Sequence, residues 1–123
     1  MEYLVIGMGG ALGANARYLV ANWAAQRLGT VFPYGTFIIN VSGSFALGFF
    51  LAFLQERILI PPHYRLFFAV GFLGAYTTFS TFTYESLRLF QDGSTFLGLA
   101  NILGSTVVGL LAVVLGFVLG RLI

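Results

Sequence analysis

Two phenylalanines stand three residues apart in the second half of the chain, Phe79 and Phe82, and side chains with that spacing share one face of a helix. The edge of a phenyl ring carries partial positive charge, so it can face an anion while repelling cations and water. The hydroxyls of Ser80 and Thr81 supply hydrogen-bond donors beside the rings. The pattern indicates either a weak anion site or ordinary aromatic packing, since the chain contains 14 Phe.

The segment 71–85 around these rings mixes glycines, hydroxyls and aromatics. Gly, Thr, Ser and Phe are mediocre to poor helix formers, so the segment predicts an interrupted helix. Where a helix is interrupted, backbone carbonyls lose their partners and can bind ions. Carbonyls freed near Gly74 and Thr77 could therefore hold a small cation.

Five further polar residues lie in or at the edge of apolar stretches, where a polar side chain must find a partner. Arg17 can draw anions into an aqueous vestibule or extend to lipid headgroups. Asn40 can donate to an anion or bond across a helix interface. Glu85 suits an intramembrane proton site or an interfacial cap. Asn101 and Ser105, four residues apart, can form a polar stripe or join two helices.

The composition places these residues in a membrane protein. The chain has 123 residues, of which 59% are hydrophobic and 8% charged, whereas soluble domains carry about a quarter charged residues. This excludes a soluble enzyme, a disordered tail and a nucleic-acid binder. The chain has no Cys and a single His, His63, so thiolate chemistry and a histidine metal site are excluded as well. We expect no enzymatic activity.

Long uncharged runs predict an all-α integral membrane fold. A helix needs about 20 apolar residues to cross the hydrocarbon core, and the chain offers four such stretches, near 3–25, 33–55, 66–88 and 95–120. Residues 110–115 are continuously apolar, without the alternation of a bilayer β-strand. We expect one membrane domain over residues 1–123, with its third span interrupted.

The arginines give almost no orientation signal. With four spans, three arginines lie on one side of the membrane and two or three on the other: Arg57, Arg65 and Arg121 against Arg27 and Arg88, with Arg17 added if it extends that way. The positive-inside rule requires a bias to fix orientation. We therefore expect insertion in both orientations and an antiparallel homodimer; the alternative is that one decisive arginine fixes a single orientation.

Small residues recur at helix-contact spacing, which favours close approach of two backbones. The pairs are Gly9 with Gly13, Ser44 with Gly48, and Gly116 with Gly120. Each pair can serve packing within one chain or contact between two chains.

The motifs together resemble those of the Fluc (CrcB-type) fluoride channel family. The quoted motifs are Gly10-x-x-Gly13-Ala14-x-x-Arg17-Tyr18, Gly35-Thr36-x-x-x-Asn40-x-x-Gly43 and Gly71-x-x-Gly74-x-x-Thr77-Thr78-Phe79-Ser80-Thr81-Phe82. The length and the four-span plan agree with the family. The resemblance implies a fluoride-selective channel in the bacterial inner membrane, an antiparallel dual-topology homodimer with two pores that let fluoride leave the cytoplasm passively.

The resemblance also implies roles for the residues in the motifs. Phe79 and Phe82 would face fluoride through their ring edges, and Asn40 would donate to it. Ser80 and Thr81 would belong to a track of hydroxyls.

Four more roles follow from the same resemblance. Glu85 would lie near one end of the hydroxyl track, and Arg17 would lie in the vestibule. The carbonyls of Gly74 and Thr77 from both subunits would hold a structural Na⁺ at the dimer axis.

The fourth span departs from the family pattern. Some relatives carry Tyr where this chain has Asn101, so Asn101 and Ser105 are assigned to the pore lining only by position. Gly109 offers no hydroxyl if the track continues there.

Two other functions compete with the channel. A small multidrug-type exporter would use an intramembrane acid for proton exchange, and Glu85 is the candidate because the first span has no acid beyond Glu2. A non-transporting scaffold subunit would use its polar groups for helix contacts alone.

Overall fold

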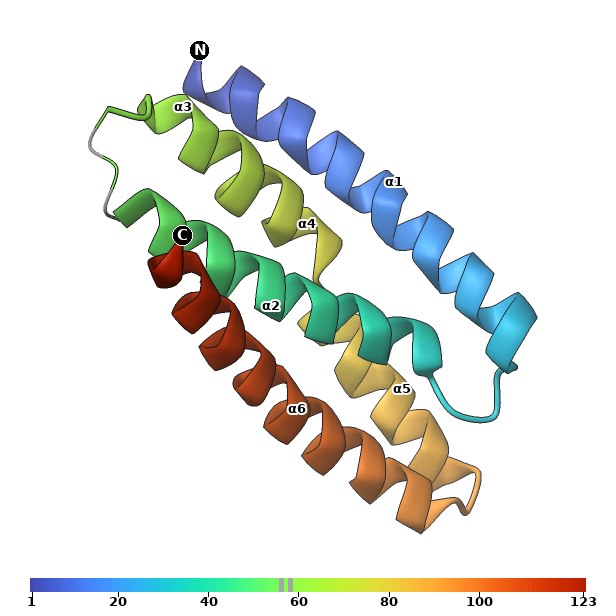
Figure 1. Ribbon diagram of the computed structural model, residues 1–123. Helices are drawn as coiled ribbons and strands as arrows, with labels where there is room; N and C mark the ends of the chain where they lie inside the picture. The colour runs from blue at the N-terminus through green and yellow to red at the C-terminus, as the bar shows by residue number, and fades with distance from the viewer. Residues whose placement is uncertain (56, 58) are drawn as a thin grey trace.

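The computed structural model describes residues 1–55, 57 and 59–123, and this part of the chain is helical, without strands (Figure 1). Its elements are α1 (Glu2–Leu28), α2 (Tyr34–Gln55), α3 (Pro62–Arg65), the π-helix η1 (Leu66–Leu73), α4 (Gly74–Tyr76), α5 (Phe79–Gln91) and α6 (Thr95–Leu122). Four stretches are long and apolar enough to cross a membrane, at 2–28, 34–55, 62–91 and 95–122. The expected all-α fold with four membrane-capable helical stretches is confirmed.

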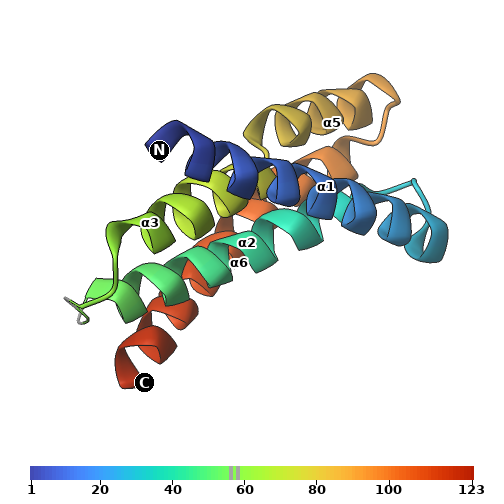
Figure 2. The ribbon, with the colours of Figure 1, turned by 90° about the horizontal axis from the view of Figure 1, so that it is seen from above.

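The helices pack as two close pairs. The η1–α4 stretch lies against α1, and α6 lies against α2, as Figures 1 and 2 show. The end of α2 and the end of α6 meet, because the Arg57 guanidinium donates a hydrogen bond of 2.8 Å to the Ile123 carbonyl. The turn between α5 and α6 lies at the opposite end of the bundle (Figure 1).

Glycines set the spacing inside both pairs. A Cβ added at Gly9 or Gly13 of α1 would overlap the carbonyl oxygen of Phe67 or Phe72. In the second pair, Cβ atoms at the small-residue positions Gly48, Gly116 and Gly120 would overlap backbone carbonyls of the facing helix. These glycines therefore serve packing within one chain, as expected for helices that associate in lipid through close backbone contact.

The outer faces of the helices are apolar and exposed. Few large apolar side chains are buried within the described residues, Ile39, Leu73 and Leu89 among them, whereas most leucines and valines of α6 are exposed. In water such a surface would aggregate. It suits contact with lipid or with a second copy of the chain.

The third stretch leaves helical geometry for two residues. Thr77 (φ −81°, ψ 154°) and Thr78 (φ −148°, ψ 118°) are extended, and α5 begins at Phe79. Thr78 is the N-cap of α5, since its hydroxyl oxygen accepts a hydrogen bond of 3.3 Å from the Thr81 N–H. Thr is a preferred N-cap residue, so the local sequence favours a new helix start at this point.

Candidate functional site

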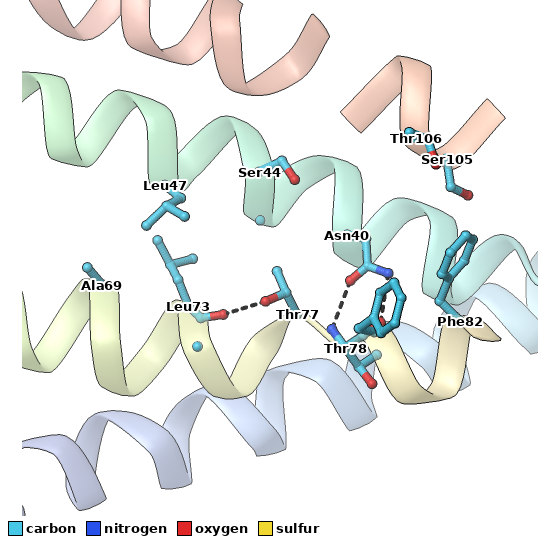
Figure 3. Close-up of a pocket in the computed structure, with 13 residues that line it drawn as sticks. Asn40, Ser44, Leu47, Ala69, Leu73, Thr77, Thr78, Phe82, Ser105 and Thr106 are labelled. Carbon is cyan, nitrogen blue, oxygen red and sulfur yellow. Dashed lines mark hydrogen bonds between the residues drawn. The ribbon is translucent and has the colours of Figure 1, made fainter. Parts of the chain in front are cut away.

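The extended dipeptide borders a pocket of about 360 Å³ (Figure 3). Side chains from α2, η1, α5 and α6 line it, and the polar groups and rings that matter below are Asn40, Thr77, Thr78, Phe79, Phe82 and Ser105. None of the 13 described residues around this pocket carries a formal charge. The pocket therefore offers neutral dipoles and aromatic rings to any ion that enters it.

Asn40 of α2 holds the extended dipeptide in place (Figure 3). Its Oδ1 accepts a hydrogen bond of 2.9 Å from the Thr78 N–H, and its Nδ2 donates one of 3.0 Å to the Thr78 carbonyl. The side-chain amide thus replaces the backbone partners that Thr78 loses by leaving the helix. An Asn amide has two N–H donors, so one remains for another acceptor.

The two sequence-selected rings lie together at the start of α5. Their centroids are 6.0 Å apart with an interplanar angle of 50°, and both rings line the pocket. Phe82 is half-buried, whereas Phe79 is 77% exposed in the single chain. One protomer therefore covers only one of the two rings.

The α4 segment borders the same pocket. Gly74 and Thr77 both line it. Because the Thr78 N–H donates to Asn40, it does not continue the helical bond to the Gly74 oxygen. The last carbonyls of a helix have no partner within that helix, so the Gly74 carbonyl is free to accept from or coordinate another group.

Arg17 of α1 meets this helix end. Its Nε donates a hydrogen bond of 3.0 Å to the Ala75 carbonyl. A cation at the C-terminal end of a helix is favourable, because the helix dipole places partial negative charge there. Arg17 therefore supports the end of α4 and is not free to extend to the headgroups with its whole side chain.

A second pocket, of about 380 Å³, lies on another face of α5. Thr81 and Glu85, four residues apart, line it together with Thr36, Arg88 and Asp92. Within the described part of the chain, Glu85 Oε1 is buried and has no hydrogen-bond partner. Thr81 and Glu85 are thus separated from Phe79 and Phe82, with which the sequence had grouped them.

The two pockets come close along α2. Asn40 lines the first pocket, and Thr36, one helical turn earlier, lines the second. Ser80 is exposed and lines neither of these two pockets. The structure therefore gathers most, but not all, of the sequence-selected polar residues around one stretch of α5.

Asn101 and Ser105 of α6 lie differently from each other. Ser105 lines the first pocket. Asn101 is fully buried, and its Nδ2 donates a hydrogen bond of 2.9 Å to Ser86 of α5. Asn101 lines neither of the two pockets described above.

Two residues of this region were not singled out as site residues from the sequence. Thr78 is the partner of Asn40, and Ser86 is the partner of Asn101. Thr78 had a local signal, since a Thr directly before a helix start is typical of an N-cap. Ser86 had a weaker one, as a hydroxyl one turn after Phe82.

Known proteins and a family model match nearly the whole length of this chain. The family model described as "CrcB-like protein, Camphor Resistance (CrcB)" covers residues 4–117. A fluoride-specific ion channel FluC of Acidobacterium capsulatum is 50% identical over 98% of this chain and 97% of its own length. Proteins of the same name from Koribacter versatilis and Solibacter usitatus are 47% and 46% identical, over 91% and 98% of this chain and 89% and 99% of their own lengths.

Proposed function

We propose a route for fluoride through this protein, which belongs to the CrcB-like family and is a fluoride-specific ion channel. The observation that carries the function is the identity of 50% to a fluoride-specific channel over nearly the full length of both chains. The four membrane-capable helical stretches agree with a multi-pass membrane protein. We propose further that fluoride leaves the cytoplasm passively, across the inner membrane of a bacterium.

The uncharged lining of the first pocket suits such an ion. Fluoride is small and strongly hydrated, so a pore must replace its water with other donors. Conduction also requires binding that is strong enough for fluoride to enter and weak enough for it to leave. The spare N–H of Asn40 and the edges of Phe79 and Phe82 are donors without a full positive charge. Ser105 lines the pocket as well, but its O–H donates to Asn101.

The two pockets are consecutive parts of the proposed route. Fluoride passes the rings and Asn40 in the first pocket, then moves one helical turn along α2 to Thr36 and Thr81 in the second. From there it leaves past Glu85. Ser80 contributes to the route only if a second chain brings an acceptor or donor to its exposed hydroxyl.

A second copy of the chain completes the route. The exposed Phe79 ring would otherwise face lipid, where its edge could not contact an ion. The balanced arginines of the sequence favour insertion in both orientations. We therefore propose an antiparallel homodimer with two pores and with the third span interrupted, at Thr77 and Thr78, inside the membrane.

The end of α4 fits the Na⁺ that the family resemblance implies. In the described residues, no cluster of three His, Cys, Asp or Glu side chains could hold a metal. The Gly74 carbonyl, however, is not used by the Thr78 N–H, and Gly74 is exposed. Carbonyls of Gly74 and Thr77 from both copies would hold the ion, whose charge raises the local potential for anions.

Ion efflux from vesicles tests the function. Purified dimers are placed in liposomes loaded with potassium fluoride or potassium chloride, and valinomycin lets potassium follow the anion. We expect rapid fluoride release at a fluoride electrode and retention of chloride. Folded dimers that release no fluoride would contradict the channel.

The unpartnered Oε1 of Glu85 keeps a proton-coupled exporter as the second candidate. An exporter needs an acid that gains and loses a proton, whereas a passive channel does not. Glu85→Gln should therefore leave most of the fluoride flux intact. Loss of transport that depends on a proton gradient, together with little passive flux in the wild type, would support the exporter instead.

A further inference from the structure

We propose that Asn101 is a positioning residue, which acts on the pore through Ser86 and Phe82 and does not touch fluoride. The proposal rests on the proposed function and concerns the same site. It differs from the expectation drawn from sequence, in which Asn101 lines the pore. The geometry that carries it is a chain of three hydrogen bonds from α6 to the backbone of α5.

The hydrogen bonds run in one direction. Ser105 Oγ lies 3.3 Å from Asn101 Oδ1 and donates to it, and Asn101 Nδ2 donates to Ser86 Oγ over 2.9 Å. Ser86 Oγ in turn donates to the Phe82 carbonyl over 2.8 Å. The chain therefore begins at one residue of the first pocket and ends on the backbone of another.

The two middle residues of this series of hydrogen bonds, Asn101 and Ser86, lie in the protein interior. Asn101 is 0% exposed and Ser86 is 4% exposed. Because Asn101 is fully buried and lines neither of the two pockets, an ion in the pockets has no access to its amide. Buried polar networks in which each member is satisfied hold their elements in one arrangement.

The arrangement held here is the position of α5 against α6. Gly98 of α6 packs closely on the Phe90 ring near the turn between the helices, and Asn101 bonds to Ser86 about one turn further along. Phe82 lies one turn before Ser86, toward the start of α5, and its residue lines the first pocket together with Ser105. Loss of the Asn101–Ser86 bond would let the start of α5 move relative to α6 and displace the ring.

A double-mutant cycle tests this coupling. The variants are Asn101→Leu, Ser86→Ala and the two combined, with Thr83→Val as the matched control. Thr83 also donates from its hydroxyl to a carbonyl of α5, that of Ser80, but it is exposed. Fluoride efflux from liposomes gives two readouts: the rate per active dimer, and the fraction of vesicles that empty, which reports correctly folded protein.

We expect each single variant to lower the rate roughly tenfold and the combined variant to be no slower than the slower single one. Thr83→Val should conduct at the wild-type rate. Full rate in Ser86→Ala with a slow Asn101→Leu would overturn the proposal, because Asn101 would then act without Ser86. Rate losses that multiply in the combined variant would overturn it as well.

Two further outcomes distinguish this inference from a purely structural role of Asn101 and from failure of the proposed function. A smaller fraction of emptied vesicles at an unchanged rate would show a purely structural role and would also overturn the proposal. A wild type that releases no fluoride in the same experiment would overturn the proposed function, and the inference with it.

Discussion

The side-chain amide of Asn40 takes the place of the backbone hydrogen-bond partners of Thr78. Both polar atoms of its amide bind Thr78, 38 positions away in sequence, and they do so where the third stretch is extended. The same amide borders the pocket that contains Phe82. One residue therefore both holds Thr78 and borders the pocket of the proposed route.

Replacement of Asn40 should cost both stability and flux. Asn40→Leu leaves the N–H and carbonyl of Thr78 without partners, and each unsatisfied buried group costs about 1–3 kcal/mol. We expect a lower Tm of the purified protein together with loss of fluoride efflux. Asn40→Asp is the informative companion, since it keeps the acceptor for the Thr78 N–H but places negative charge beside the route.

The Asp variant should retain more of the thermal stability than the Leu variant and yet conduct as poorly. An Asn40→Leu protein with the wild-type Tm would show that the hydrogen bonds from Asn40 to Thr78 do not stabilise the protein. An Asn40→Asp protein with wild-type flux would contradict the placement of fluoride beside this amide.

The sequence drew attention to the candidate site residues but not to their hydrogen-bond partners. Asn40, Phe79 and Phe82 were selected because polar groups and paired rings within apolar spans are informative in themselves. The bonds from Asn40 to Thr78 and from Asn101 to Ser86 join different membrane-capable stretches, and no spacing within one helix predicts them. The side of α5 that Thr81 and Glu85 face depends on the same packing.

At the scale of the elements, close packing depends on the glycines of α1. A Cβ at Gly13 would overlap the Phe72 carbonyl, whereas an added Cβ at Gly7 meets nothing within 4 Å. Gly13→Ala should therefore push α1 away from η1, and overpacking of this kind costs about 1–3 kcal/mol. Gly7→Ala is the matched control on the same helix.

Thermal unfolding of the two variants in the same detergent measures the difference. We expect a clearly lower Tm for Gly13→Ala and an unchanged or slightly higher one for Gly7→Ala, since Ala is the better helix former. Equal Tm values would show that α1 and η1 do not pack as closely as the structure has them.

The elements were predictable to different degrees. Uncharged runs of sufficient length predicted four helical stretches, because lipid leaves few alternatives to a helix. The π-helix η1 was not predicted. Its residues 66–73 form a largely apolar run that ends before Gly74, without a Pro, and nothing local distinguishes it from an α-helix.

At the scale of the whole molecule, the charges predict two orientations in the membrane. The loop at 29–33 and the segment around His63 are separated by α2 and therefore lie at opposite ends of the bundle. The chain has no Cys of its own that would react with a thiol reagent. Thr30→Cys and His63→Cys are exposed positions suited to labelling with a membrane-impermeant thiol reagent.

Both variants should be labelled in part from each side of intact cells or inverted vesicles. The physical reason is that nearly equal numbers of arginines on the two sides give no preferred orientation. Labelling of each variant from a single side would contradict dual topology and, with it, the antiparallel dimer.

The exposed ring of Phe79 provides the most direct test of the central claim, that aromatic edges and neutral polar groups conduct fluoride. Phe79 and Phe96 are 77% and 80% exposed in the single chain. A general effect of replacing an exposed ring should therefore be the same at both positions. We predict that Phe79→Ile lowers fluoride efflux from liposomes at least about tenfold, equivalent to about 1.4 kcal/mol, while Phe96→Ile conducts as the wild type and both remain dimeric. Wild-type efflux from dimeric Phe79→Ile would contradict the account.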